Sequence, residues 1–141
     1  MAFKINIGDK GKTYHLESDS ESLHGLKLGE KIQGKDINSD LAGYELEITG
    51  MTDKAGFPSK KEIEGLGLKK LLLSYGPNQH KSRPKGIRLR KSIRGNTISK
   101  DIVQINLLVK KHGEKKLHEI FPEQNKPKEK VEAKVEEKAA A

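Results

Sequence analysis

Apolar side chains recur at every second position in several short segments of this chain, and glycine-containing turns separate the segments. Successive side chains of an extended strand point to opposite faces, so this period predicts strands with one buried face. The alternation is cleanest at Tyr44, Leu46 and Ile48. The expected strands cover residues 3–7, 13–17, 32–37, 44–49, 66–74, 87–94 and 103–109.

A series of short strands with glycine-rich turns favours a mainly β domain, either a small barrel-like domain or a sandwich. Short helical turns are expected after Ser20 and over residues 39–42, and residues 59–64 resemble a capped first turn of helix. The apolar centre of residues 66–74 predicts a buried strand.

The composition allows one domain with a lean core. The chain has 141 residues, of which 33% are hydrophobic and 34% charged. We place a β-rich domain at residues 1–121 and a charged tail at residues 122–141. The tail is mostly Lys, Glu and Ala, and such a composition cannot offset the entropy lost on ordering. It is expected to be disordered, and helical at most around residues 129–138.

Positive charge is concentrated in the middle of the chain. The net charge is −3 over residues 1–59, +9 over residues 60–94 and +2 over residues 95–141. Residues 65–100 contain ten basic side chains and no Asp or Glu, and all four arginines lie between Arg83 and Arg94. The planar arginine fork can bind phosphate through two hydrogen bonds. The segment therefore predicts a phosphate-binding site, and the alternative is a solvated basic surface loop.

A localised positive field attracts a polyanion to one face of a protein, so a polynucleotide is the expected partner. An anionic membrane fits less well, because no segment pairs basic residues with a broad apolar helical face. The aliphatic residues at positions 87, 89 and 93 alternate with Arg88, Arg90 and Arg94. An extended chain would thus place these three arginines on one face.

Other function classes lack their motifs. There is no cysteine, the five histidines are scattered, and neither a G-x-S-x-G nor a G-x-x-x-x-G-K-[ST] motif occurs. We therefore expect no enzyme activity, no metal or cofactor and no small-molecule substrate. The N-terminal residues alternate in polarity, unlike a signal peptide, and no window approaches the ~20 apolar residues of a membrane span. A soluble, cytoplasmic protein is expected.

Residues 50–58 form a dense irregular segment with two glycines and a proline, expected to end the preceding strand. Asp53 can accept hydrogen bonds from backbone amides, Gly56 can adopt positive φ, and Pro58 keeps Phe57 extended. Two interpretations stay open. The segment is either a stiff loop pinned by Phe57 or a brace for the basic region that follows.

This segment, Thr49-Gly-Met-Thr-Asp-Lys-Ala-Gly-Phe-Pro58, resembles the signature of the archaeal and eukaryotic small-subunit ribosomal protein six (S-six-e) family. Three further stretches agree in order and spacing: Gly43-Tyr44, Leu71-Leu-Leu-Ser74 and Lys91-Ser-Ile-Arg-Gly95. The resemblance covers roughly residues 1–113. The sequence departs from the family pattern at Met51, Thr52 and Ser59, where Gly, Asn and Met are usual.

The resemblance implies a barrel-like domain bound to small-subunit ribosomal RNA, next to neighbouring ribosomal proteins. Eukaryotic members continue into a long basic helix with phosphorylated serines. This chain has no Ser or Thr after Ser99 and is similar to the shorter archaeal form. We expect a structural constituent of the small (30S-type) subunit, with a free-standing RNA- or DNA-binding regulator as the alternative. The residues expected to bind RNA are Lys60, Lys61, Lys69, Lys70, Lys81, Arg83, Lys85, Arg88, Arg90, Lys91 and Arg94.

Overall fold

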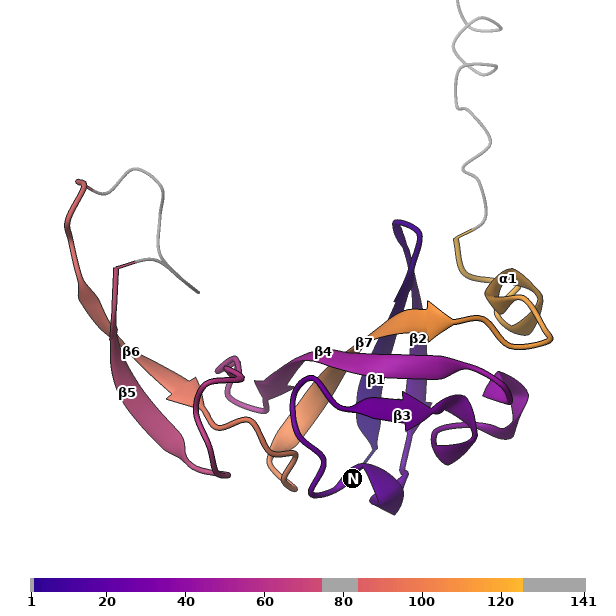
Figure 1. Ribbon diagram of the computed structural model, residues 1–141, viewed down its shortest axis with the longest axis horizontal. Helices are drawn as coiled ribbons and strands as arrows, with labels where there is room; N and C mark the ends of the chain where they lie inside the picture. The colour runs from indigo at the N-terminus through magenta and orange to yellow at the C-terminus, as the bar shows by residue number, and fades with distance from the viewer. Residues whose placement is uncertain (1, 75–83, 126–141) are drawn as a thin grey trace, which may run out of the picture.

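The computed structural model describes residues 2–74 and 84–125, and these contain two separate β-sheets (Figure 1). The larger sheet has the strand order β2-β1-β7-β4-β3, in which only β1 and β7 run parallel. Its strands are β1 (Phe3–Asp9), β2 (Lys12–Ser18), β3 (Lys31–Gln33), β4 (Glu45–Asp53) and β7 (Ile102–Lys111).

The smaller sheet is an antiparallel pair, β5 (Leu68–Leu73) and β6 (Leu89–Arg94), and we call it the basic ribbon. The mainly β fold is therefore confirmed, but the barrel-like form is not, because neither sheet closes on itself and β2 and β3 are edge strands. Short helical turns are η1 (Glu21–Leu23), η2 (Gly34–Asp36), η3 (Ser39–Leu41) and α1 (Leu117–Ile120).

The core lies on one face of the five-stranded sheet. Most of the alternating apolar residues of β1, β4 and β7 are buried there, as the sequence predicted, and Val103 and Val109 are half-buried. Leu23, Leu41 and Leu117, from three of the helical turns, cover this face. Each such side chain stabilises the fold by about 1.5–3 kcal/mol on burial.

The first hairpin has the two-residue turn that favours close antiparallel pairing. Lys10 and Gly11 both have positive φ, 44° and 81°, between the paired residues Asp9 and Lys12. Turns of this kind match the right-handed twist of the flanking strands. The two predicted strands are confirmed.

The second half of β4 differs from the prediction. Residues 50–53 continue the strand instead of ending it, because a bulge at Thr49 absorbs the irregularity in register against β7. Two further predictions are wrong: residues 34–36 form a helical turn rather than a strand, and residues 59–64 are irregular rather than helical.

The strand predicted at residues 66–74 exists as β5, but it is not buried. Leu68 and Leu72 are 47% and 53% exposed. The apolar composition of this segment suggested burial, but a strand is buried only where a second layer of structure packs against it. Away from the buried residues Ile93 and Arg94, β5 and β6 contact chiefly each other and lack such a layer in the described part of the chain. No helix among the described residues is long and apolar enough to cross a membrane.

Residues beyond the predicted domain boundary at 121 contact the edge strand β2. The Gln124 amide accepts a hydrogen bond from the His15 backbone N–H (2.6 Å) and donates one to the His15 carbonyl (2.8 Å). Asn125 donates to the Thr13 carbonyl, and the ring of Phe121 lies against Tyr14. We therefore extend the proposed domain to residue 125. The tail helix expected around residues 129–138 lies outside the described residues.

Replacing Gln124 with Ala should lower the free energy of unfolding by about 1 kcal/mol. The substitution removes the two hydrogen bonds between the Gln124 side chain and the backbone of the edge strand β2. Urea denaturation of the full chain measures this. Glu114→Ala, at an exposed position near α1, is the control and should change stability by less than about 0.5 kcal/mol. Equal stability of the two variants would mean that Gln124 does not hold the segment to β2.

Candidate nucleic-acid interface

Five of the six cross-strand residue pairs of the basic ribbon contain a lysine or an arginine. The pairs are Leu68–Arg94, Lys69–Ile93, Lys70–Ser92, Leu71–Lys91, Leu72–Arg90 and Leu73–Leu89. Each base lies opposite a residue without charge. Because like charges placed directly opposite destabilise a sheet, this arrangement accommodates a high charge density at little cost.

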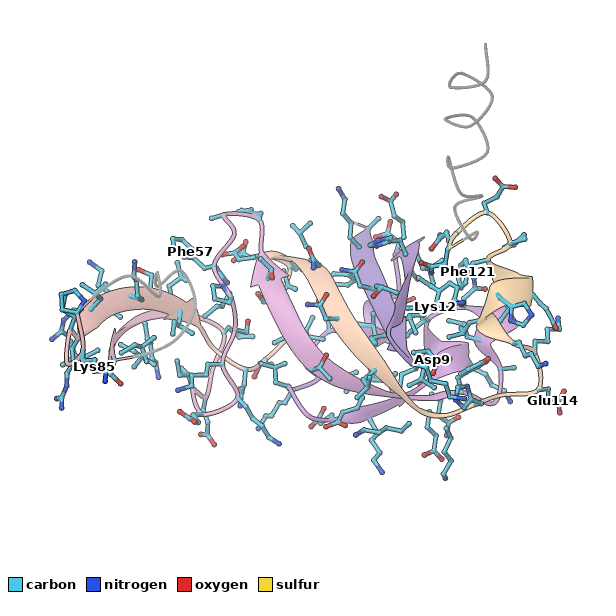
Figure 2. The ribbon with its side chains drawn as sticks, turned by 90° about the horizontal axis from the view of Figure 1, so that it is seen from above. Asp9, Lys12, Phe57, Lys85, Glu114 and Phe121 are labelled. Atoms are coloured by element: carbon cyan, nitrogen blue, oxygen red, sulfur yellow. The ribbon has the colours of Figure 1, made fainter. Side chains whose placement is uncertain are left out.

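Most of these bases are open to solvent. The side chains of Lys69, Lys70, Arg88 and Arg90 are exposed and that of Lys91 is half-buried. Figure 2 shows Lys85, also exposed, at the end of the basic ribbon remote from the five-stranded sheet. Within the described residues none of these six takes part in an ion pair. Their charge is available to an external anion.

Two lysines of β7, by contrast, form ion pairs within the five-stranded sheet. Lys110 lies 2.7 Å from Glu47, and Lys111 lies 2.6 Å from Glu45. The hydrogen bonds from these lysines lower the pKa of both carboxyl groups. The charges of these two lysines are thus compensated, whereas the exposed lysines and arginines of the basic ribbon have no ion-pair partner among the described residues. This difference directs a polyanion towards the basic ribbon.

The structure does not bring all the predicted binding residues to the ribbon surface. Lys60 and Lys61 lie in the connection between β4 and β5, where Lys60 forms an ion pair with Glu62 (2.7 Å). Lys69 also donates a hydrogen bond to the Glu64 carbonyl (3.3 Å). Lys81 and Arg83 lie outside the described residues.

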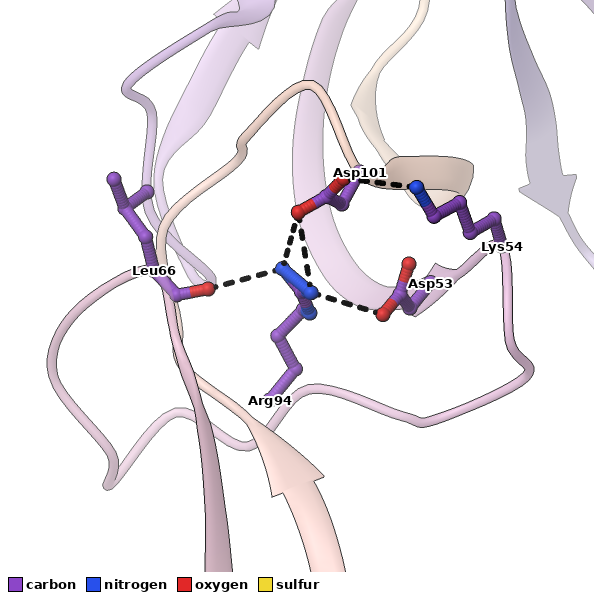
Figure 3. A network of polar contacts seen from close by, with 5 residues as sticks. All are labelled: Asp53, Lys54, Leu66, Arg94 and Asp101. Atoms are coloured by element: carbon purple, nitrogen blue, oxygen red, sulfur yellow. Dashed lines mark hydrogen bonds and ion pairs between the residues drawn. The ribbon is translucent and has the colours of Figure 1, made fainter.

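Arg94 stands apart from the other arginines, because its side chain is only 10% exposed (Figure 3). It forms ion pairs with Asp53 (3.0 Å) and Asp101 (3.2 Å) and donates a hydrogen bond to the Leu66 carbonyl (3.1 Å). Lys54 contacts the other oxygen of Asp101 (3.3 Å). The guanidinium group is thus held inside the protein, at the root of the basic ribbon.

Sequence reasoning missed this network because alternation predicts the face of a strand, not its depth. Arg90 and Arg94 do share a face of β6, yet one is exposed and the other buried. The partners come from the end of β4 and from the turn before β7. The one available signal was the position of Asp101, the first acidic residue after the acid-free segment 65–100.

The irregular segment after β4 does brace the basic region, which confirms one of the two interpretations. The Pro58 carbonyl accepts a hydrogen bond from the Arg94 N–H (2.9 Å), and the Arg94 carbonyl accepts one from the Lys60 N–H (3.3 Å). Gly95 packs closely here, since an added Cβ would lie 1.9 Å from the Gly65 carbonyl oxygen. Backbone contacts and the Arg94 network together fix where the basic ribbon leaves the sheet.

The described residues contain no cluster of three or more His, Cys, Asp or Glu side chains suited to a metal ion. What the site offers is a row of fixed cations on a rigidly rooted strand pair. This arrangement can bind phosphate groups.

Comparison with known proteins adds an independent line of evidence. A family model described as ribosomal protein S6e matches residues 1–122. The chain is similar to proteins named small ribosomal subunit protein eS6 from archaea. It is 42% identical to that of Methanosphaera stadtmanae over 132 residues, covering 92% of this chain and 99% of the relative. It is 48% identical to that of Methanothermobacter thermautotrophicus over 124 residues, covering 86% and 96%.

The protein of the same name from Methanocaldococcus jannaschii is 46% identical over 111 residues, covering 79% of this chain and 82% of the relative. The family model and the relatives agree with the resemblance found in the signature around residues 49–58. The match extends across both sheets, the basic ribbon included. From its sequence, this chain belongs to the ribosomal protein S6e family.

Proposed function

We propose that the protein is a non-enzymatic structural constituent of the small ribosomal subunit and binds folded ribosomal RNA through the basic ribbon. The observation that carries this proposal is the set of exposed lysines and arginines that form no ion pair with any described residue, on a ribbon without carboxylates. The names of the archaeal relatives support the assignment to the small subunit. Neighbouring ribosomal proteins and a cytoplasmic location follow from the same proposal.

The chemistry of the basic ribbon suits positioning on RNA rather than reading its sequence. Contacts to phosphate and sugar fix a protein on a nucleic acid but carry no direct sequence information. The chain has only three Phe, three Tyr and no Trp, so it offers few surfaces for stacking unpaired bases. Double-helical or compact RNA is therefore the better match, because its regular backbone presents phosphates at fixed spacing.

The residues proposed to bind phosphate directly are those exposed on the basic ribbon and its outer end. They are Lys69, Lys70, Lys85, Arg88, Arg90 and Lys91, and Lys81 and Arg83 stay in the proposed set from the sequence. Lys60 and Lys61 are proposed as supporting charges. We assign Arg94 a structural role instead, because two carboxylates and a carbonyl already occupy its guanidinium group.

Sedimentation of the tagged protein from an archaeal cell lysate through a sucrose gradient tests the proposal. The full chain should travel with small subunits and stay bound in a high-salt wash, as a protein locked into folded RNA would. A free-standing RNA- or DNA-binding regulator is the alternative, and it would stay near the top of the gradient or be released by salt. That result would contradict the ribosomal assignment.

A further inference from the structure

The lysine and arginine side chains of the basic ribbon are divided between its two faces. Neighbouring side chains of a strand point to opposite sides, and residues paired across two strands share a side. By the observed register, Lys70 and Arg90 lie on one face, and Lys69 and Lys91 lie on the other. Each face thus carries one base from β5 and one from β6.

Beyond its root, where Ile93 and Arg94 are buried, neither face of the ribbon is covered by another layer of the described structure. β5 and β6 make their extensive contacts only with each other, and the ribbon projects away from the five-stranded sheet (Figures 1 and 2). On the first face Lys70 and Arg90 are both exposed. On the second face Lys69 is exposed and Lys91 is half-buried. Both faces are therefore open to a ligand at the same time.

A ribbon that contacts RNA on one side only does not need basic side chains on the other side. Surfaces that face water usually mix both signs of charge. This ribbon instead keeps both faces basic and contains no carboxylate on either. The four basic side chains other than Arg94 repel one another on this narrow strand pair unless counter-charges lie close to both faces. The arrangement fits a polyanion on each side better than it fits one polyanion and solvent.

We propose that the basic ribbon is a two-sided element that inserts between two phosphate backbones and holds two segments of folded RNA together. This proposal rests on the proposed function, because it assumes that the ribbon binds RNA. It adds that binding by each face is separate and that the product is a bridge between RNA segments. The root formed by Arg94 and Asp53 gives the ribbon a fixed direction, so both segments are held at a defined place.

The test counts how many RNA duplexes one protein molecule binds. The probe is a blunt RNA duplex of about 16 base pairs, the length that a typical double-stranded-RNA-binding domain spans. Sedimentation velocity with excess duplex measures the stoichiometry, and fluorescence anisotropy at one salt concentration measures the affinity. Two variants of the full chain each remove two bases from one face: Lys70→Gln with Arg90→Gln, and Lys69→Gln with Lys91→Gln. The control removes two exposed bases from the five-stranded sheet, Lys4→Gln with Lys12→Gln.

The wild type and the control should form complexes of one protein with two duplexes. Each face variant should form only the complex with one duplex, because the opposite face stays intact. Affinity for that first duplex should fall no more than about threefold, because the intact face keeps its phosphate contacts. Near-equal behaviour of the two face variants is the mark of a two-sided element.

Two results would overturn the two-sided element and leave RNA binding in place. One is a wild type that binds a single duplex, with only one of the face variants weakened. The other is a complex with two duplexes that survives in both face variants, which would place the second contact elsewhere. Failure of the wild type to bind any RNA duplex is a different result, because it would contradict the proposed function itself.

Discussion

Replacing Arg94 with Met should lower the free energy of unfolding by about 3–5 kcal/mol, although Arg94 lies in the most basic part of the chain. The substitution leaves the Asp53 carboxylate, whose side chain is 3% exposed, without its ion-pair partner. A buried charge without a partner is costly because water no longer solvates it. Loss of the Asp101 contact adds little, since that side chain is 46% exposed. Urea denaturation of the full chain measures the effect.

The matched control is Arg90→Met on the same face of β6, where the side chain is exposed. It should change stability by no more than about 0.5 kcal/mol. Adding Asp53→Leu to Arg94→Met should recover part of the loss, because a buried pair replaced by apolar side chains is often neutral. A cost below about 1 kcal/mol for Arg94→Met, or one equal to that of Arg90→Met, would contradict the structural role of Arg94.

Removing four charges from the basic ribbon should lower affinity for an RNA duplex by about 10²–10³ at physiological salt, if each base neutralises one phosphate. The variant changes Lys70, Arg88, Arg90 and Lys91 to Gln. Its thermal stability should stay close to that of the wild type, because these side chains form no ion pairs among the described residues. Fluorescence anisotropy with a labelled duplex gives the affinity.

Two controls accompany this variant. The first tests whether the position of the removed charges matters, and the second tests whether the planar shape of the arginine side chain matters. Changing four exposed lysines of the body, Lys4, Lys12, Lys31 and Lys115, to Gln removes the same charge but should lower affinity far less. Changing Arg88 and Arg90 to Lys keeps the charge and removes the planar forks. If each fork contributes on the order of 1 kcal/mol, that double variant should bind about tenfold to thirtyfold more weakly. Equal losses in the body and ribbon variants would refute the assignment of the site.

The period of apolar residues was sufficient to locate the strands of the main sheet. β1, β2 and β7 follow directly from alternation, because each pairs along its length and buries one face. The continuation of β4 could not be read in the same way. A bulge at Thr49 keeps residues 50–53 in the sheet, and the sequence shows only a glycine and a broken pattern there.

The sequence did not specify how deeply individual side chains are buried. The leucines of β5 indicated burial, but burial depends on a covering layer from elsewhere in the chain, and the described residues place none over the exposed leucines of β5. Arg94 shows the opposite case, a charged residue made buried by two distant carboxylates. The contact of Gln124 with β2 was equally invisible, because a single polar side chain at the start of a charged segment carries no pattern.

The salt dependence of RNA binding tests the central claim most directly. Affinity of the wild type and of the variant lacking the four ribbon charges is measured for one RNA duplex across a range of salt concentrations. If about five to six basic side chains meet phosphates, log affinity of the wild type should fall against log salt with a slope of about −4.5 to −5.5. The variant's slope should be shallower by about 3–4 units. A wild-type slope near zero, or equal slopes for the two proteins, would contradict the claim that the basic ribbon binds the RNA backbone.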